Sequence, residues 1–265
     1  MNVVCAGLPV RVSEWGRGEP LVLAHGLGED HRVWRGVVPH LALTRRVIAY
    51  DLRGHAETAP GELAATLAQL GSDLVALLDA MELDQADLCG FSLGGTVVLR
   101  AAIDAPRRVR HLVPVATSSR VGAAAAAWYR ERAELADRGL HALEPVLEQE
   151  TRQLLHDAPE ALAGYWLLRR QAVSDPRGFA NACRAMARLH DEPLDPELGA
   201  VEAPALVIAG ERDPLCPPRA AEIVAGAIPG ARLKVVQGSG HLFPVERPAE
   251  LSRLLLDFLE SRPGG

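Results

Sequence analysis

The sequence lacks the cysteine pairs and histidine spacings that build disulfide frameworks and metal sites. No Cys-x-x-Cys pair occurs, and the four cysteines stand far apart, at Cys5, Cys89, Cys183 and Cys216. Scattered thiols of this kind are expected to be reduced and buried, and Cys216 is expected to pack. There is no His-Glu-x-x-His spacing, glycine-rich dinucleotide fingerprint or P-loop. We therefore expect no cofactor and no metal, even at the neighbouring His25 and His31.

Long apolar runs and an excess of positive charge are also missing. No run approaches the roughly 20 apolar residues that span a bilayer, and the first residues, MNVVCAGLPV, lack the pattern of a secretion signal. The net charge of -6 at pH 7 gives no basic surface for nucleic acid. We expect a cytoplasmic protein that binds a small molecule, without membrane or nucleic-acid partners, as a monomer or homodimer.

Short apolar runs alternate along the chain with longer segments of helical period. Leucines between 63 and 81 and between 251 and 259 recur every three or four residues, which gives each segment one apolar face. This alternation is typical of an α/β fold, with a parallel sheet covered by helices on both faces. Pro114 falls inside one expected strand and should weaken or shorten it. The expected strands are 21–24, 47–50, 87–90, 112–116, 205–209 and 233–236.

The alternation stops between about residues 120 and 200, where helical segments follow one another directly. Glycine and proline separate these segments, and three further prolines precede the next strand. The sequence therefore predicts a core domain of residues 1–119 and 201–265 and a helical cap, or lid, of residues 120–200. The expected cap helices are 123–137, 143–156, 159–173 and 177–189.

The motif that carries chemistry is Gly90-Phe91-Ser92-Leu93-Gly94-Gly95, which follows an expected strand and precedes a helical run. A G-x-S-x-G sequence in this context predicts a nucleophile elbow, where a sharp turn exposes the serine and small neighbours let strand and helix approach. The amino terminus of the next helix then points N–H groups toward the same place. Ser92 is the candidate nucleophile.

A serine hydroxyl needs a base, and the base needs an orienting carboxylate. Asp213 follows the strand at 205–209, and His241 follows the strand at 233–236 in Gly-Ser-Gly-His. Each residue alone could be a turn former or a helix cap. In the chain order serine, acid, histidine, they predict a triad of Ser92, Asp213 and His241.

Together these motifs resemble the α/β-hydrolase family over essentially the whole chain. The resemblance also rests on HGLG at 25–28 and DLRGH at 51–55. It implies a mostly parallel, eight-stranded sheet and an oxyanion hole formed by the backbone N–H groups of Leu27 and Leu93. His25 would hold the oxyanion loop by hydrogen bonds. The chain departs from the family pattern D-x-R-G-x-G-x-S at Ala56 and Thr58, in a loop expected to shape the pocket wall, and His55 is expected at the loop surface.

Within the family, the chain looks most like 3-oxoadipate enol-lactonases and small-molecule esterases. This similarity implies a serine hydrolase that cleaves a small carboxylic ester or lactone through an acyl-enzyme. An arginine of the cap could meet a substrate carboxylate, although most should lie on solvated faces: Arg130, Arg132, Arg169, Arg184 and Arg188. The candidate substrate-binding residues are His25, Trp34, Trp128, Trp166 and Met186.

Other functions remain open at this stage. The same fold and triad serve C–C bond hydrolases, cofactor-free haloperoxidases, thioesterases and biosynthetic cyclases. From a different class, the chain could be a ligand sensor that keeps the triad. Product analysis separates the enzymes from one another, and repeated turnover separates an enzyme from a sensor.

Overall fold

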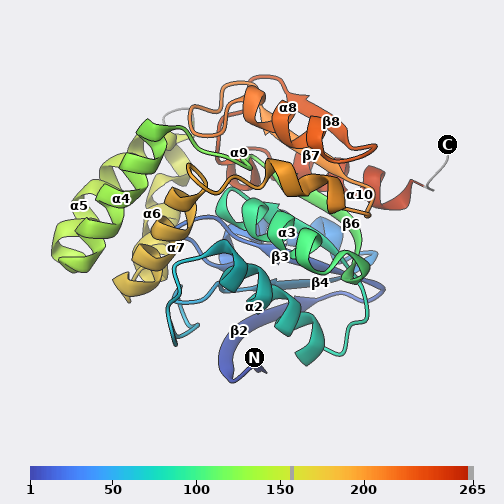
Figure 1. Ribbon diagram of the computed structural model, residues 1–265, viewed down its shortest axis with the longest axis horizontal. Coiled ribbons are helices and arrows are strands. Elements are labelled where there is room, and N and C mark those ends of the chain that lie inside the picture. The colour runs from blue at the N-terminus through green and yellow to red at the C-terminus, as the bar shows by residue number, and fades with distance from the viewer. Residues whose placement is uncertain (156–157, 262–265) are drawn as a thin grey trace.

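The computed structural model describes residues 1–155 and 158–261, and their strands form a single twisted sheet (Figure 1). The strands are β1 (Asn2–Cys5), β2 (Leu8–Trp15), β3 (Glu19–Ala24), β4 (Arg45–Tyr50), β5 (Ala86–Phe91), β6 (Val109–Val115), β7 (Leu206–Gly210) and β8 (Arg232–Val236). Their order across the eight-stranded sheet is β1-β2-β4-β3-β5-β6-β7-β8. β2 is antiparallel to both its neighbours, and the other pairs are parallel. The predicted fold class is confirmed.

The six strands expected from apolar runs are present, within a few residues of the predicted ends. β1 and β2 were not located by such runs. In β2, Leu8, Val10 and Val12 are buried while the residues between them are more exposed, so this antiparallel strand follows a period of two. Parallel strands covered on both faces read as continuous apolar runs, whereas an antiparallel strand with one more exposed face does not.

Pro114 lies within β6, which weakens only one side of the strand. The N–H groups of Leu112 and Ala116 donate to the carbonyls of Pro204, just before β7, and of Ile208, within β7. Position 114 faces the same neighbour without an N–H to give. The pairing of β6 with β7 is accordingly reduced to Val115 with Ile208, plus one isolated bridge.

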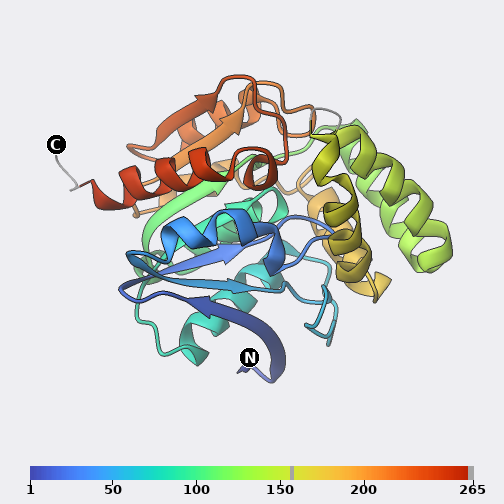
Figure 2. The same ribbon diagram turned by 180° about the vertical axis from the view of Figure 1, so that it is seen from behind.

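Helices cover both faces of the sheet, and each face has its own apolar core (Figures 1 and 2). One face carries α2 (Leu67–Ala80), α3 (Leu93–Asp104) and α8 (Pro218–Ala227). The other carries the 3-10 helix η1 (His31–Gly36), α1 (Val38–Leu41), α9 (Phe243–Glu246) and α10 (Pro248–Glu260). Short 3-10 turns η2 (Pro106–Arg108) and η4 (Asp195–Ala200) connect to β6 and β7.

The start of α2 differs from the predicted apolar stripe. Leu63 lies before the helix and is exposed. The helix begins after Thr66, whose side chain accepts the N–H of Gln69 and so satisfies one of the donors left unpaired at a helix start. From Leu67 onward the leucines face the core as predicted.

Four helices, α4 (Ala123–Asp137), α5 (Leu140–Leu154), α6 (Leu162–Ala172) and α7 (Pro176–Arg188), occupy the segment predicted as the cap. The predicted third helix is divided, because η3 (Pro159–Ala161) forms its first turn. The predicted end of the second helix at His156 lies outside the described residues. Figure 1 shows the four helices as a group beside the sheet. No helix in the described ranges combines the length and apolarity that crossing a bilayer requires.

The cap packs closely against the core where two glycines meet. A Cβ on Gly54 would lie 2.3 Å from the Cα of Gly178, at the start of α7. Nearby, the Oδ1 of Asn181 accepts the N–H of Ala65 at 2.7 Å. Because neither glycine leaves room for a side chain, α7 packs on the backbone of the loop after β4.

Candidate active site

Ser92 occupies the sharp turn between β5 and α3, as the G-x-S-x-G pattern predicts. Its backbone has φ 52° and ψ −118°, a conformation that side chains rarely adopt. A Cβ on Gly90 would lie 2.1 Å from the carbonyl oxygen of Gly94, and a Cβ on Gly94 would lie 2.2 Å from that of Ala24. The pattern is therefore a steric requirement, since larger residues would separate the helix from the strands.

The structure brings the three predicted residues together in one hydrogen-bonded row. His241 Nε2 lies 3.1 Å from Ser92 Oγ, and His241 Nδ1 lies 2.7 Å from Asp213 Oδ2. With the proton on Nδ1, the imidazole donates to the carboxylate and accepts from the hydroxyl. Asp213 and His241 are both buried, so water competes little for these bonds. Such a row can deprotonate the hydroxyl as it attacks a carbonyl.

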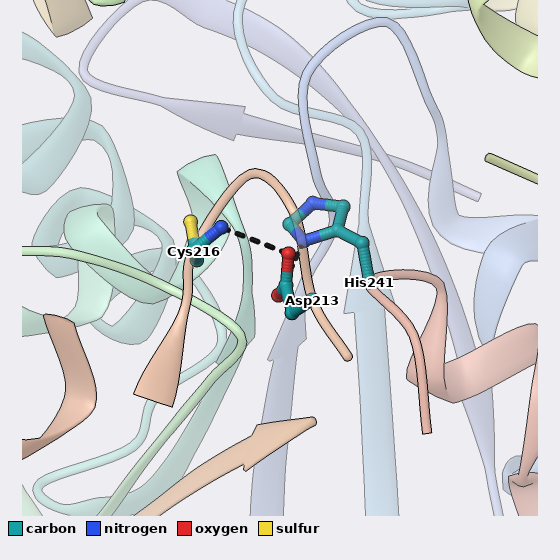
Figure 3. A group of neighbouring side chains, drawn as sticks. All are labelled: Asp213, Cys216 and His241. Atoms are coloured by element: carbon teal, nitrogen blue, oxygen red, sulfur yellow. Dashed lines mark hydrogen bonds and ion pairs between the residues drawn. The ribbon is translucent and has the colours of Figure 1, made fainter. Parts of the chain in front are cut away.

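Cys216 lies on the other side of Asp213 from His241, as Figure 3 shows. Its backbone N–H donates to Asp213 Oδ1 at 2.8 Å. Burial raises the pKa of the Cys216 thiol far above its usual value, so the thiolate that would bind a metal or attack a substrate is disfavoured. The predicted packing role fits this position.

In a second group of possible metal ligands, His31 and Asp51 bond to each other and Asp30 bonds to Arg32. His31 Nδ1 lies 2.7 Å from Asp51 Oδ1, and the Asp30 carboxylate is ion-paired with Arg32. These bonds use the oxygens and the ring nitrogen that a cation would need. These side chains therefore suit a role in holding their loops together better than a role in binding a metal.

The predicted oxyanion donors, Leu27 and Leu93, lie on the two backbone segments beside Ser92. Leu93 is the first residue of α3, so its N–H is one of the donors that a helix start leaves unpaired. Among the described residues, no acceptor is found for the N–H of Leu27 either. Leu93 thus lies at the amino terminus of α3 directly after Ser92, whose own N–H donates to Val115 O at 2.9 Å. Leu27 and Ser92 line the same cavity.

The loop that carries Leu27 is held by side chains on both sides. His25 Nε2 accepts the N–H of Leu52 at 2.9 Å, and its Nδ1 donates to Gly26 O at 2.8 Å. The N–H of Gly28 donates to His55 Nε2 at 3.3 Å. His25 therefore has the structural role predicted for it. His55 is fully buried and does not lie at the loop surface as expected, because its ring supports this loop.

A cavity of about 700 Å³ opens beside Ser92 and His241. The core contributes the loop with Gly26, Leu27 and Glu29, Phe91 and the loop after β7, and the cap contributes about half of the wall. No residue of the loop with Ala56 and Thr58 reaches this wall; Thr58 Oγ1 instead accepts the N–H of Arg11. The cap residues in the wall are Ala125, Trp128, Tyr129, Arg132, Val146, Gln149, Glu150, Gln153, Leu154, Tyr165 and Arg169.

Of the five predicted substrate-binding residues, only Trp128 lies in the cavity wall. His25 is buried beneath the loop. Trp34 is fully buried in the core between the sheet and α10, and Met186 packs in the opposite core. Trp166 packs against the apolar core of the cap. Helical spacing identifies the apolar face of a helix. The faces that carry Trp34, Trp166 and Met186 pack against other parts of the protein and do not line the cavity.

Arginines of the cap divide in the same way. Arg132 and Arg169 line the cavity. The other three of the five candidate arginines surround a separate surface hollow, where each is paired with a carboxylate: Arg130 with Asp191, Arg184 with Asp137 and Arg188 with Glu192. Exposed pairs of this kind contribute little to stability or binding, in line with the expectation of solvated faces.

Two glutamates next to the predicted motifs were missed. Glu29 Oε2 accepts the N–H of Gly26 at 2.8 Å, in the loop that carries Leu27. Glu246 accepts the N–H groups of Gly240 and Leu242, at 2.9 and 3.1 Å, on either side of His241. The sequence offers only a weak signal for these two roles. In each case an acidic residue follows a glycine of a motif by three to six positions.

Residues 19–248 match the model of the alpha/beta hydrolase fold. The chain belongs to the α/β-hydrolase family. The α/β hydrolase is 30% identical to 3-oxoadipate enol-lactonase 1 of Acinetobacter baylyi over 261 residues, which cover 96% of this chain and 93% of the relative.

Two further relatives extend the comparison. A 2-hydroxymuconate semialdehyde hydrolase of Pseudomonas is 30% identical over 278 residues, covering 97% of this chain and 93% of the relative. Among solved structures, the enol-lactonase of Burkholderia xenovorans has a TM-score of 0.88 at 27% identity, over 98% of this chain and 100% of that chain. The predicted resemblance to enol-lactonases is confirmed, and the chain is a hydrolase-superfamily member with enol-lactonase and esterase-like relatives.

Proposed function

We propose that this α/β hydrolase is a serine hydrolase that cleaves a small-molecule carboxylic ester or lactone through an acyl-enzyme. The observation that carries the proposal is the hydrogen-bonded row of Ser92, His241 and Asp213, whose hydroxyl end opens into the cavity. The similarity to enol-lactonases supports the choice of an acyl substrate.

In the proposed mechanism, His241 takes the proton of Ser92 as Oγ attacks the substrate carbonyl. Asp213 keeps the imidazole in the required tautomer and stabilises its charged form. The backbone N–H groups of Leu27 and Leu93 hold the oxyanion, and each such donor is worth roughly 3 kcal/mol of transition-state stabilisation. His241 then gives the proton to the leaving alkoxide, and activates the water that cleaves the acyl-enzyme. Every step uses groups of this chain.

The cavity favours a small substrate with both apolar and polar parts. A volume of about 700 Å³ falls within the range of small-molecule sites. Trp128 offers an apolar surface, and Arg132 stacks 4.8 Å from the centre of its ring while pairing with Glu150. Arg169, by contrast, has a buried Nε with no partner within the described ranges. We propose that the cap, residues 120–200, selects the substrate and the core carries out the reaction.

The proposal is tested by a screen of short p-nitrophenyl esters and small lactones. Wild type should turn over many equivalents, and Ser92→Ala should lose at least about 1,000-fold in kcat, because removing a triad member leaves only binding and the oxyanion hole. Ser118→Ala is the matched control, since this nearby buried hydroxyl contacts Cys216 and not His241. Activity that persists in Ser92→Ala would refute the nucleophile, and stoichiometric processing alone would favour a sensor.

A second candidate keeps the same three residues but cleaves a carbon–carbon bond. The 30% identity to a 2-hydroxymuconate semialdehyde hydrolase supports this candidate. The remaining alternatives are thioesterase, haloperoxidase and cyclase chemistry. Product analysis decides between the two. Ester or lactone cleavage gives an alcohol or a hydroxy acid, whereas C–C cleavage of a diketone analogue gives a ketone and an acid.

A further inference from the structure

A buried carboxyl group lies directly beside the loop that carries Leu27. Glu29 is about 2% exposed and lines the cavity. Its Oε2 accepts the N–H of Gly26 at 2.8 Å, and a Cβ on Gly26 would lie at the same distance from that oxygen. The glycine therefore leaves the space in which the carboxyl group sits. Gly26 and Gly28 give their N–H groups to Glu29 and His55, which leaves the Leu27 N–H between them available.

The other oxygen of Glu29 reaches the cap. Tyr165, on α6, donates its hydroxyl hydrogen to Glu29 Oε1, 136 residues away in sequence. Arg169 lies four residues further along α6, on the same helix face. Its Nη2 donates to the Leu27 carbonyl at 3.5 Å, and its Nη1 donates to Thr151 at 3.0 Å. One face of α6 thus contacts the oxyanion loop at two points.

We propose that Glu29 is a positioning residue through which the cap helix α6 sets the place of the Leu27 N–H. The proposal rests on the proposed function, because it concerns the oxyanion that forms on an acyl substrate. Glu29 fixes one end of the loop by its bond to Gly26, and Tyr165 fixes Glu29. The Leu27 N–H is therefore correctly placed for the oxyanion only when the cap is in its present position.

The charges around the loop support this arrangement. Both hydrogen bonds to Glu29 come from donors, Tyr165 O–H and Gly26 N–H, which suits an ionised carboxylate. A bare negative charge next to a developing oxyanion would oppose catalysis. The positive charge of Arg169, on the same helix face as Tyr165, offsets it. Burial raises the pKa of Glu29 above its usual value, and the hydrogen bond from Tyr165, the charge of Arg169 and the N–H of Gly26 reduce this rise without cancelling it.

Two substitutions separate this role from general packing. Glu29→Gln keeps the shape but turns one acceptor into an NH₂ donor, so it cannot accept from both Gly26 and Tyr165. Tyr165→Phe keeps the ring and removes only the hydroxyl. With p-nitrophenyl butyrate, both should lower kcat about 10-fold to 100-fold, because small displacements of catalytic groups have costs of this order, and KM should change less than about 3-fold.

A ligand that forms a tetrahedral adduct with serine gives an independent measurement. Phenylboronic acid places an oxygen where the oxyanion forms, so its Ki should rise in parallel with the loss in kcat in both variants. A residue with a merely structural role would change thermal stability without this parallel. If Glu29→Gln fails to fold, Tyr165→Phe still tests the proposal, since the bond between Glu29 and Gly26 remains.

The matched control breaks another bond between α6 and the core. Gln171 Oε1 accepts from Arg32 Nη1 at 2.7 Å, a bond that involves none of residues 25–29. Gln171→Ala should leave kcat and the boronate Ki unchanged. Equal losses in Gln171→Ala and Tyr165→Phe would overturn the proposal in favour of a loosened cap, and so would wild-type values in Tyr165→Phe. Full activity in Ser92→Ala would instead refute the proposed function, which keeps the two failures distinct.

Discussion

The carboxylate of Asp213 is held on one side by the backbone and on the other by His241. Its Oδ1 accepts the N–H groups of Leu215 and Cys216, both at 2.8 Å, and its Oδ2 lies 2.7 Å from His241 Nδ1. The two backbone bonds fix the plane of the carboxylate, so the imidazole meets the oxygen in one orientation. The loop after β7 therefore sets the orientation of the Asp213 carboxylate and, through it, that of the His241 ring.

Asp213→Asn should keep this geometry and remove most of the activity. The amide can donate to Nδ1, which favours the tautomer that carries its proton on Nε2, so His241 no longer accepts from Ser92. We expect kcat to fall by about 10⁴-fold, as for the corresponding change in a serine protease triad. Steady-state kinetics with circular dichroism as a folding check measures this. A loss of less than 10-fold would remove Asp213 from the mechanism.

Gly94→Ala should destabilise the protein, because the new Cβ would lie 2.2 Å from the carbonyl oxygen of Ala24. We expect the free energy of unfolding to fall by about 3 kcal/mol, at the upper end for overpacking. Gly226→Ala is the control, since Gly226 is exposed within α8 and its Cβ meets nothing within 4 Å. The free energy of unfolding of this variant should rise by about 0.5–1 kcal/mol, because alanine favours the helix more than glycine does. Urea unfolding compares the two; equal effects would contradict the steric argument.

Stability should decrease with acidity because of His55. Burial, together with the nearby His25, lowers the pKa of His55 to about 3. In the neutral ring, Nε2 accepts from Gly28 N–H and Nδ1 donates to Arg53 O, so a second proton would lose the first bond. Between pH 6.5 and about 3, only the unfolded ring binds this proton. The free energy of unfolding should therefore decrease as the pH is lowered through that window. This group contributes a decrease of at most about 1.4 kcal/mol per pH unit.

His55→Gln tests this by removing the titrating ring. Urea unfolding at several pH values should give a shallower decline for the variant than for wild type between pH 6.5 and 4. His190→Gln, which changes an exposed ring, is the control. A slope unchanged in His55→Gln would show that the imidazole does not contribute to the acid sensitivity.

Trp128 and Trp34 should respond differently to truncation. Trp128→Ala opens the cavity wall, so we expect kcat/KM to fall about 10-fold, a typical value for one lost apolar contact, with little change in stability. Trp34→Ala creates a void in the fully buried core and should cost about 3–5 kcal/mol of stability. Kinetics and unfolding of both variants are compared. A specific kcat/KM loss in a stably folded Trp34→Ala would restore Trp34 as a substrate-binding residue.

The sequence by itself determined the features that depend on neighbours along the chain. Apolar runs located the buried strands, and the glycines around Ser92 marked the turn, because contacts at 2.1–2.2 Å allow nothing larger. Asp213 and His241 could be chosen because each follows a strand, and parallel strands end at the same edge of a sheet. Local steric limits and one topological rule were sufficient for these predictions.

Only the tertiary structure decided which side chains reach the cavity and what supports the oxyanion loop. Helical period identifies an apolar face but not its partner, so Trp34 and Trp128 looked equivalent although one faces the core and the other the cavity. The contact of Glu29 with Tyr165 joins residues 136 positions apart. It depends on where α6 docks, and this position is set by the packing of the cap as a whole and not by any local pattern.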